Sequence, residues 1–582
     1  MTPGSMTPAT DVTDVTDAMD AMDATDVTDV TDVVVVGAGP TGLMLAAELC
    51  LGGARTTVVD ERSGPTAESR ASTLHARTME ILDSRGLLAA LDGPPRETRG
   101  HFGGLPMDLT PPGPLGGPYP GQWKVSQTRT EELLGERAAA LGADLRRRHR
   151  LLSLETHADG VAVRAEGPGG EPLLLRASYL VACDGEESTV RRLTGAAFPG
   201  RDAGRELLRA DVTGVRIADR RFQRLERGLA IAATRNGTTR VMVHEFGRRA
   251  VPRDGGAPDF AEVARAWRRV TGEDISHGTP LWVNAFGDTD RQLARYRHGR
   301  VLFAGDAAHR QMPSGGQALN LGVQDAFNLG WKLAAVVRGG VGEDLLDTYH
   351  RERHAVGRRT LANIRAQTYL LLGGPEVEPA RALLGELMSL EEVRGSLAGA
   401  ISGVGIRYDT AEGRHPLLGR RLPDAALTGT EAGVDTDTGA GAGAGADAYA
   451  DAGTGIGTGA GPARPASNRG TPRTTELLRS GRGVLLLLGA DGAGALRETA
   501  APWAGTGRIT VVEARPRTGQ DEELLGTEAL LVRPDGYVAW AGARAEGLTE
   551  AFRRWFGTPT ATPRTGSRTA TPTAPDTSRR TS

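Results

Sequence analysis

The chain has few of the residues that mark disulfide-rich, metal-binding or membrane proteins. Its 582 residues include two cysteines, Cys50 and Cys183, both inside apolar stretches. This excludes a disulfide framework, a zinc site and a CxxC redox pair, so we predict buried free thiols and no metal. No apolar run approaches the roughly 18 residues of a membrane span, and no signal peptide is visible. We therefore expect a soluble, cytoplasmic protein that does not bind membranes.

An excess of charge of one sign is also missing. The 69 Lys and Arg residues nearly balance 72 Asp and Glu residues, which leaves a net charge of −3. Nothing in this balance favours a nucleic-acid partner. Hydrophobic residues make up 39% of the chain, enough for globular packing. The length predicts two to four domains.

Residues 33–61 form the most informative stretch of the sequence. Four valines predict a buried parallel strand, a GxGxxG pattern follows at residues 37–42, residues 43–51 have helical character, and residues 56–59 read as a second strand. A lone GxGxxG also fits a glycine-rich turn. Strand, glycines, helix, second strand and terminal acid in this order favour dinucleotide binding instead, without choosing between FAD and a nicotinamide cofactor.

Each part of this pattern has a predicted task. Gly37 permits a tight turn, Gly39 lets the backbone approach a pyrophosphate, and Gly42 lets helix and strand pack together. The helix that follows offers its N-terminus to the phosphates. An acid at the end of the second strand binds a ribose diol. We favour Glu61 over Asp60 for this task, because Asp60 equally suits a cap of the strand end.

Two further strands end in an acid. Residues 179–183 lead into Asp184-Gly185, and residues 300–304 lead into Gly305-Asp306. An acid at the carboxyl end of a strand lies where open α/β sheets bind ligands. For Asp184 a helix cap or turn is the alternative. Residues 312–320 place proline and paired glycines before a long helix at 323–337, where exposed backbone N–H groups suit a flavin ring edge.

Three motifs together, GAGPTG at 37–42, CDG at 183–185 and GDAAH at 305–309, resemble the FAD-dependent aromatic hydroxylases of the para-hydroxybenzoate hydroxylase type. The resemblance covers about residues 33–409. The closer likeness is to the aromatic polyketide hydroxylases of angucycline and related pathways. The stretches that carry this likeness are ESR at 68–70, ARTMEI at 76–81, HFGGLPMD at 101–108, GWKL at 330–333, YHRERHAVG at 349–357 and HPLLGRRLPD at 415–424. That group also carries a C-terminal thioredoxin-like domain without a redox CxxC, which residues 470–557 fit.

The resemblance implies a mixed α/β fold with a Rossmann-like FAD-binding domain, an interleaved β-rich substrate domain and the thioredoxin-like domain. The expected divisions are these: an acidic disordered tail at 1–32; the FAD domain at 33–100, 122–204 and 287–400; the substrate domain at 101–121 and 205–286; a Gly/Ala linker at 434–468; the thioredoxin-like domain at 409–433 and 469–557; and a disordered tail at 558–582.

The resemblance also implies a role for individual residues. Glu61 would bind the adenosine ribose, Arg70 and Gln127 would contact the FAD phosphate and ribityl region, and Asp184 would serve FAD and incoming NADPH. Asp306 would bind the ribityl and pyrophosphate part. The remaining predicted cofactor contacts are Gly37, Gly39, Pro40, Thr41, Gly42, Arg62, Gly305, Pro313, Gly315, Gly316, Gln317, Ala318, Leu319 and Asn320. The family usually has glycine where this chain has Ala318, and the added methyl group predicts restricted ring movement.

The expected activity follows from the same resemblance. A single dinucleotide signature suits NADPH that binds transiently, reduces FAD and leaves. Dioxygen then forms a C4a-hydroperoxyflavin that hydroxylates a phenolic ring in a water-excluding site. No side chain is assigned as nucleophile or general base, and for His309 we expect a structural role. His101 and Phe286 are weak candidates for substrate contact, and the β-rich layer should supply an apolar pocket for a polycyclic ligand.

We therefore predict an NADPH- and FAD-dependent hydroxylase of a polycyclic aromatic polyketide in antibiotic biosynthesis, as a monomer or homodimer. Two alternatives remain open on the sequence. One is a Baeyer–Villiger oxygenase acting beside a carbonyl of a related polyketide, and the other is a flavin-binding scaffold without catalysis.

Overall fold

The computed structural model describes residues 28–66, 72–251, 253, 256–409, 413–431, 472–489, 492–517 and 524–559. The predictions for Arg70, for the linker at 434–468 and for most of both tails fall outside these ranges. Within them, no helix has the length and apolar character needed to cross a membrane.

A six-stranded sheet forms the centre of the N-terminal body (residues 28–409). Its order is β21 (Arg297–His298), β22 (Val301–Phe303), β13 (Tyr179–Ala182), β2 (Val33–Val36), β3 (Thr56–Asp60) and β9 (Asp144–Arg147). All neighbours are parallel except β21 and β22. Strands β2, β3, β13 and β22 are buried along their whole length, which explains their continuous apolar runs. Because β22, β13 and β2 are adjacent, the three motif-bearing strand ends meet at one edge.

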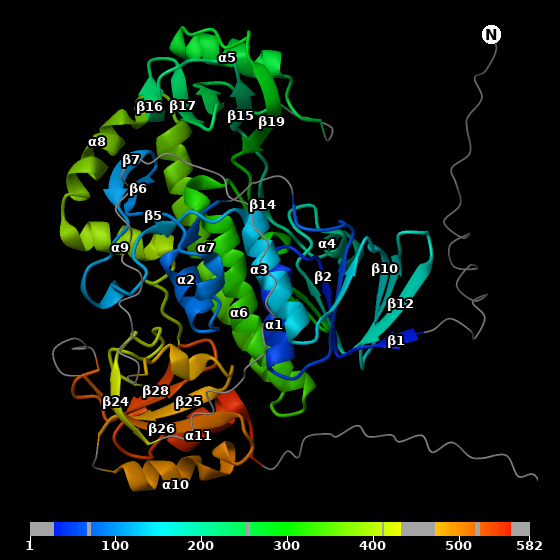
Figure 1. The fold of residues 1–582 in the computed structure, drawn as a ribbon, viewed down its shortest axis with the longest axis vertical. Helices are drawn as coiled ribbons and strands as arrows, with labels where there is room; N and C mark the ends of the chain where they lie inside the picture. Colours follow the sequence, from blue (N-terminus) through cyan, green and yellow to red (C-terminus); the bar gives the residue numbers. More distant parts are fainter. Residues whose placement is uncertain are drawn as a thin grey trace, which may run out of the picture.

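Helices cover one face of this sheet, and a second sheet covers the other (Figure 1). The helices are α1 (Pro40–Leu51), α3 (Gln127–Ala140) and the 21-residue α6 (Gln317–Val337). The second sheet has the order β1 (Thr28–Val30), β12 (Pro172–Ala177), β11 (Val161–Glu166) and β10 (Arg150–Thr156). The tail prediction for 1–32 is thus wrong at its end, because residues 28–30 pair in parallel with β12 and form the edge strand of this sheet.

The predicted β-rich layer is confirmed as a five-stranded antiparallel sheet. Its order is β16 (Arg220–Leu225), β17 (Gly228–Arg235), β18 (Thr238–Glu245), β15 (Glu206–Thr213) and β19 (Thr279–Gly287). Helix α5 (Phe260–Thr271) packs Val263 and Trp267 on one face. The other face packs Leu207 and Leu229 against Met312 and against Ile364 of the 29-residue helix α7 (Asp344–Leu372).

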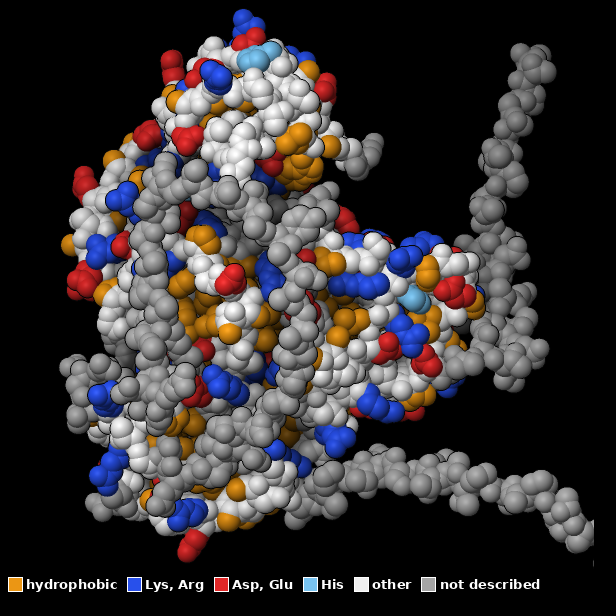
Figure 2. All heavy atoms as spheres, in the orientation of Figure 1, with side chains coloured by type: hydrophobic (Ala, Val, Ile, Leu, Met, Phe, Trp, Pro, Cys, Tyr) orange, Lys and Arg blue, Asp and Glu red, His pale blue; other side chains and the backbone are white. Residues whose placement is uncertain are grey.

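Short elements join these layers. The hairpin β6 (Arg99–Phe102) and β7 (Leu105–Asp108) packs on α7, α8 (Glu378–Leu387) and α9 (Glu391–Ser402). The other short elements are α2 (Ala76–Asp83), α4 (Thr189–Thr194), β4 (Leu74–His75), β5 (Arg96–Glu97), β8 (Gln122–Trp123), β14 (Gly200–Arg201), β20 (Asp290–Gln292) and β23 (His309–Gln311). On the visible face, basic and acidic side chains are interspersed (Figure 2).

The C-terminal unit is a mixed α/β unit. Its sheet order is β24 (Leu427–Glu431), β26 (Ile509–Pro516), β25 (Gly483–Leu487), β27 (Ala529–Val532) and β28 (Val538–Gly542), with α10 (Ala493–Ala504) and α11 (Leu548–Phe556). Strands β25 and β26 are parallel across α10, whereas β27 and β28 are antiparallel to their neighbours.

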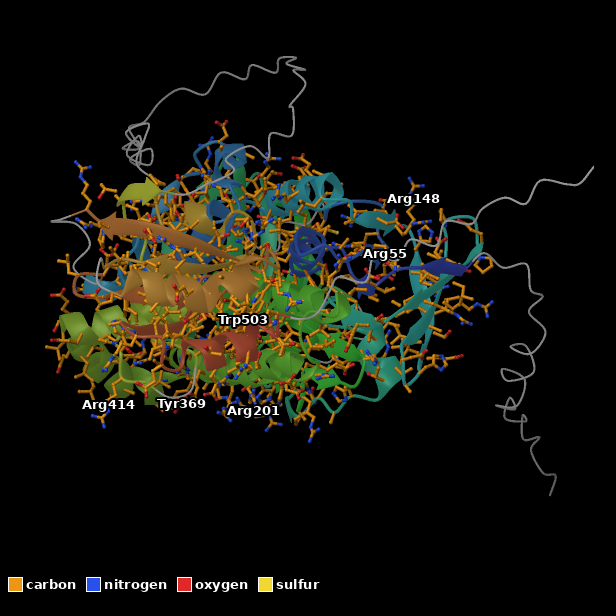
Figure 3. All side chains as sticks on the ribbon, turned by 90° about the horizontal axis from the view of Figure 1, so that it is seen from below. Arg55, Arg148, Arg201, Tyr369, Arg414 and Trp503 are labelled. Carbon is orange, nitrogen blue, oxygen red and sulfur yellow. The ribbon has the colours of Figure 1, made fainter. Side chains whose placement is uncertain are left out.

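This unit is packed firmly on the N-terminal body. Trp555 of α11 lies 6.4 Å, centroid to centroid, from Trp331 of α6, and both belong to the same apolar cluster as the central sheet. Figure 3 shows the orange and red C-terminal unit beside the green helices, with Trp503 of α10 near their border. The two units therefore share one core.

Candidate functional site

The turn after β2 is shaped by glycines that have no room for a side chain. Gly37 has φ +101°, and a Cβ there would lie 2.3 Å from the carbonyl oxygen of Cys183 on the neighbouring strand end. A Cβ on Gly42 would lie 1.9 Å from the Gly37 oxygen. Gly39 differs, since a Cβ there would meet only Arg62 Nη2, at 3.8 Å. The backbone at Gly39 is therefore open to a ligand.

Helix α1 begins directly on this open position. Its first residue is Pro40 and its N-cap is Gly39, with no side chain capping its backbone N–H groups. Helix α1 therefore begins at Pro40, before the start of the helical stretch predicted at 43–51. Proline is preorganised for a first helical position, and an uncapped N-terminus attracts anions through its N–H groups and dipole. Pro40, Thr41 and Gly42 are placed where a pyrophosphate would bind.

The acid beside the glycine turn is Asp60, whereas Glu61 is exposed. Asp60 is 6% exposed, and its carboxylate accepts hydrogen bonds from the backbone N–H of Ala38 at 2.5 Å and of Arg62 at 2.8 Å. Both carboxylate oxygens of Asp60 are thus used by the backbone, which fits the alternative of a strand-end cap. Glu61 directly follows β3, is exposed and stays the predicted ribose ligand.

Arg62 and Gln127 are brought together by one carboxylate. Gln127, the first residue of α3, donates its amide to Glu131 Oε1 at 2.9 Å, and Arg62 Nη1 lies 4.0 Å from the same oxygen. Since Arg62 also borders Gly39, both predicted residues lie along the same side of the turn. Glu131, which holds them, was not singled out in the sequence.

Asp184 follows β13 and serves the next helix. Its Oδ2 accepts a hydrogen bond from the backbone N–H of Val190 at 3.0 Å, in the first turn of α4. Burial raises the pKa of Asp184, partly offset by hydrogen bonds that include those from Ser188 and Val190. The alternative interpretation as a helix cap is therefore correct for this oxygen, and any contact with a cofactor is additional to it.

The turn after β22 is held from beneath by a buried ion network. Gly305 has φ +63° and packs on Thr41, and its N–H donates to Asp325 Oδ2 at 3.2 Å. His309 Nε2 lies 2.7 Å from the same oxygen, and Arg353 Nε donates to Asp325 Oδ1 at 2.7 Å. His309, Asp325 and Arg353 have no exposed surface. His309 thus has the structural role expected of it.

This network fixes the charge of Asp325. Burial opposes ionisation of its carboxyl group, but Arg353 and His309 outweigh that effect and lower its pKa. Asp306, the next residue after Gly305, is by contrast exposed at the surface of the turn. Neither Asp325 nor Arg353 was predicted, although Arg353 lies within the YHRERHAVG stretch at 349–357.

The loop at 313–316 leads into α6 through two glycines in left-handed backbone conformations, Gly315 (φ +66°) and Gly316 (φ +69°). Gly316 is the N-cap of α6, and no side chain caps this end. Asn320 Nδ2 donates to the Gly316 carbonyl at 2.8 Å, while its Oδ1 accepts from the His75 backbone N–H and the Thr78 hydroxyl. Asn320 therefore braces the loop.

His75 holds the same loop from the start of α2. Its Nε2 lies 2.8 Å from the Gly315 carbonyl oxygen, and its side chain is completely buried. Burial lowers the pKa of His75 to about 4, so the neutral ring donates its Nε2–H to this carbonyl. His75 and Thr78 were not predicted as site residues. His75 directly precedes the ARTMEI stretch and Thr78 lies within it. Nothing in that stretch indicates a contact between His75 and Gly315, 240 residues later in the chain.

The predicted cofactor fits this arrangement of donors. Uncapped N-termini of α1 and α6 suit the pyrophosphate and the electron-rich edge of a flavin, and exposed Asp306 lies on the turn that packs on α1. Ser314 Oγ is buried and has no hydrogen-bond partner among the described residues, so it can accept or donate a bond to a bound ring. Ala318 and Leu319 follow in the first turn of α6 and are half-buried.

The two weak substrate candidates are far apart. His101 on β6 lies 4.0 Å, centroid to centroid, from the Phe222 ring on β16, and burial lowers its pKa to about 4. Phe286 on β19 lies beneath the Arg209 guanidinium, 4.5 Å from its ring centroid. β16 and β19 are opposite edges of a five-stranded sheet, about 19 Å apart at the usual strand spacing. A single ring cannot contact both.

A cavity of about 800 Å³ lies between α6, α7, α9 and residues 403–406. None of its lining residues belongs to the five-stranded sheet, although the sequence placed a large pocket there. Within the described ranges, no cluster of three His, Cys, Asp or Glu side chains could hold a metal ion.

Comparison with known proteins agrees with this geometry. Residues 30–364 match the family described as FAD binding domain, and residues 454–559 match the family described as aromatic-ring hydroxylase, C-terminal. The chain is 39% identical to 12-dehydrotetracycline 5-monooxygenase/anhydrotetracycline 6-monooxygenase of Streptomyces rimosus, over 90% of this chain and 99% of that protein. It is 39% identical to a rifampicin monooxygenase of Streptomyces venezuelae, over 91% and 99%. The crystal structure of CabE, an aromatic hydroxylase from angucycline biosynthesis, matches with a TM-score of 0.79 and 44% identity, over 91% and 99%.

Proposed function

This chain belongs to the family of FAD-dependent aromatic monooxygenases, and on that premise we propose that it hydroxylates a polycyclic aromatic polyketide at the expense of NADPH and dioxygen. The observation that carries the proposal is the meeting of three distant segments, at Gly37, Asp184 and Gly305, on adjacent strand ends. The fused-ring polyketides named for the relatives give the substrate class.

Each end of the cofactor has its own residues in this proposal. Glu61 binds the ribose diol, the α1 N-terminus with Arg62 binds the pyrophosphate, and Asp306 binds the ribityl hydroxyls. The Gly315-Gly316 turn and the α6 N-terminus hold the ring. When bound, FAD accepts electrons from NADPH and supplies the chemistry that transfers one oxygen atom from dioxygen to the substrate.

The substrate-facing side of the site comes from the five-stranded sheet. Leu207 and Leu229 on its inner face pack on Met312. Met312 directly precedes the loop at 313–316, called the ring loop here. This face carries apolar side chains and lies beside the hairpin that presents His101 and Gly103. Such a wall excludes water and holds an aromatic ring flat, which oxygen transfer requires.

We infer a thioredoxin-like fold for the C-terminal unit. A βαβ half, β25-α10-β26, followed by a ββα half, β27-β28-α11, supports this inference. Within the described residues, the unit contains no cysteine. We assign it no redox chemistry and treat it as a structural part of the monooxygenase.

The test is product analysis after incubation with NADPH, labelled dioxygen and a tetracyclic phenol of the angucyclinone type. We expect a yellow protein, faster NADPH oxidation in the presence of the phenol, and one labelled oxygen atom as a ring hydroxyl. An inserted ring oxygen would favour a Baeyer–Villiger oxygenase instead. No turnover over a panel of polyphenols by the FAD-loaded protein would favour a non-catalytic flavin-binding role.

A further inference from the structure

Helix α2 lies where the N-terminal body meets the C-terminal unit (Figure 1), and all of its residues are buried. At its start, His75 Nε2 lies 2.8 Å from the Gly315 carbonyl oxygen, and the Thr78 hydroxyl donates to Asn320 Oδ1 at 2.7 Å. These two contacts tie α2 to the ring loop and to the first turn of α6. The place of the ring loop therefore depends on the place of α2.

The side chain of Arg77 leaves α2 in another direction, toward the C-terminal unit. Its Nη2 donates to the Asp535 carbonyl oxygen at 2.9 Å, and its guanidinium group lies 5.1 Å from the centroid of the Tyr537 ring. Successive residues of an α-helix point about 100° apart, so Arg77 and Thr78 contact different surroundings. Arg77, Asp535 and Tyr537 are all buried. The helix thus holds the ring loop on one side and the C-terminal unit on another.

A buried carboxylate adds a second contact between the same helix and the same unit. Arg77 Nη1 donates to Glu80 Oε2 at 3.1 Å, and Glu80 Oε1 lies 3.1 Å from Arg421 Nη1. Arg421 forms a β-bridge with Tyr537 and so belongs to the C-terminal unit. All three charged groups are buried, and separating buried charges from their partners is costly. Helix α2 and the C-terminal unit are therefore fixed relative to each other.

The part of the C-terminal unit that receives Arg77 is the β27–β28 turn. The same turn reaches α6, where Asn328 Nδ2 donates to Asp535 Oδ2 at 3.2 Å. Gly536 of this turn has φ +79°, and a Cβ there would lie 3.2 Å from Leu478 Cδ1 and 3.8 Å from Arg77 Nη2. The turn is therefore packed closely against both of the helices that hold the ring loop.

We propose that Arg77 is a positioning residue for the flavin, through which the C-terminal unit sets the place of the ring loop. The unit needs no redox group for this role, because its β27–β28 turn supports α2, and α2 holds Gly315 and Asn320. A ring loop in its correct place keeps the flavin in a site that excludes water, which limits the release of hydrogen peroxide. The inference rests on the proposed function, which assigns the flavin ring to the ring loop.

The absorbance spectrum of FAD bound to the full chain tests this role. Arg77→Met removes both hydrogen bonds of the guanidinium group and keeps a long side chain. FAD should stay bound, its absorbance maximum should shift, and more hydrogen peroxide should be released per NADPH consumed. Gly536→Ala acts from the C-terminal unit on the same contact and should shift the maximum in the same direction. Since neighbouring residues in one contact are not additive, the double variant should shift it no further than the larger single change.

Gly507→Ala is the matched control for backbone strain in the C-terminal unit. Gly507 also has a left-handed backbone conformation (φ +71°), but a Cβ there would meet no atom of the described residues within 4 Å. The substitution should lower the free energy of unfolding, because alanine is strained at positive φ, and should leave the flavin spectrum unchanged.

Two results would overturn the positioning role of Arg77. One is an unchanged flavin spectrum in Arg77→Met and Gly536→Ala, and the other is an equal shift in Gly507→Ala, which would attribute the shift to lost stability alone. Failure of the wild type to oxidise any polyphenol would count against the proposed function instead. The spectra need only bound FAD, so they decide the role of Arg77 in either case.

Discussion

Arg533 and Glu352, 181 residues apart, form a buried bidentate ion pair that joins the C-terminal unit to the N-terminal body. Arg533 Nη1 donates to Glu352 Oε1 at 2.6 Å and Nη2 donates to Oε2 at 3.0 Å. Lys332 Nζ donates to the same carboxylate at 2.8 Å, and Asp535 pairs with Arg533. Two cations and two anions thus neutralise one another where the β27–β28 turn enters between α6 and α7.

The acid stability of the protein should depend on Glu352. Burial alone would raise the pKa of its carboxyl group, but Arg533 and Lys332 outweigh burial and lower it from 4.5 to about 2. A depressed carboxyl pKa stabilises the fold above about pH 4.5, and that contribution is lost as pH falls toward 2. Urea unfolding from pH 6 to pH 2.5 should show this loss in wild type and a flatter profile in Glu352→Gln.

The same variant should also be less stable at neutral pH. Removing one partner of a buried ion network typically costs about 3–5 kcal/mol, and here Arg533 and Lys332 are left with Asp535 as the one carboxylate of the network. Glu343→Gln removes a carboxylate whose ion pair with Arg297 is half exposed, and it should cost about 1 kcal/mol or less. Equal effects of the two substitutions would contradict this account of the buried pair.

Replacing Arg353 with Met should weaken FAD binding from a distance. Arg353 contacts no predicted cofactor residue, but its loss leaves Asp325 buried with His309 as its remaining charged partner, and Asp325 holds the Gly305 N–H. We expect a loss of about 3–5 kcal/mol in unfolding free energy and weaker FAD retention in fluorescence titration. Tyr408→Phe removes one hydrogen bond to Arg353 and should cost about 1 kcal/mol. Unchanged FAD affinity in Arg353→Met would show that the Gly305 turn needs no such support.

Asn320→Ala should loosen the ring loop while the adenine end stays bound. The substitution leaves the His75 backbone N–H and the Gly316 carbonyl without their partner, at about 1–3 kcal/mol for a buried unsatisfied group. We expect retained FAD, a shifted flavin absorbance spectrum and more hydrogen peroxide released per NADPH consumed. Asn363→Ala is the control, since Asn363 lies on α7 and contacts Gln367. A normal flavin absorbance spectrum in Asn320→Ala would show that Asn320 does not brace the ring loop.

The acids of the cofactor groove should differ in importance. Asp306→Ala removes an exposed carboxylate proposed to bind the ribityl chain, and hydrogen bonds to charged groups contribute about 1.5–3 kcal/mol, so FAD affinity should fall roughly tenfold or more. Glu61→Ala removes the exposed acid predicted to bind the ribose and should weaken FAD binding to a similar extent. Asp60→Asn should mainly lower the free energy of unfolding, because Asp60 accepts backbone hydrogen bonds from Ala38 and Arg62. Normal FAD binding in both Glu61→Ala and Asp306→Ala would contradict this assignment.

Ala318→Gly should change flavin reduction more than flavin binding. Ala318 is half-buried in the first turn of α6, and the resemblance implies that its methyl group restricts ring movement. Removing it should speed reduction by NADPH in stopped-flow measurements at the cost of about 1 kcal/mol of helix stability. An exposed control is Ala366→Gly on α7. Equal reduction rates in wild type and Ala318→Gly would show that the methyl group does not limit the ring.

The sequence alone determined the elements and their local tasks. Four consecutive valines, glycines at fixed spacing and an acid after a strand are short-range patterns, and each reflects backbone sterics or burial at its own position. They predicted β2, the turn at Gly37–Gly42 and a β-rich layer at 205–286. The three motif-bearing strand ends also converge, because the carboxyl ends of adjacent parallel strands lie at the same edge of the sheet.

Only the tertiary structure decided which side chains meet. It gave Asp60 the backbone hydrogen bonds beside the turn and left Glu61 exposed, since only strand register decides which of two neighbouring acids faces the turn. It paired Asp325 with Arg353, His75 with Gly315, and Glu352 with Arg533, contacts between segments whose separate patterns carry no signal of each other. It also put the large cavity behind α6 and not on the sheet. Burial and pairing of charged groups depend on which surfaces come together, and that is a property of the folded chain.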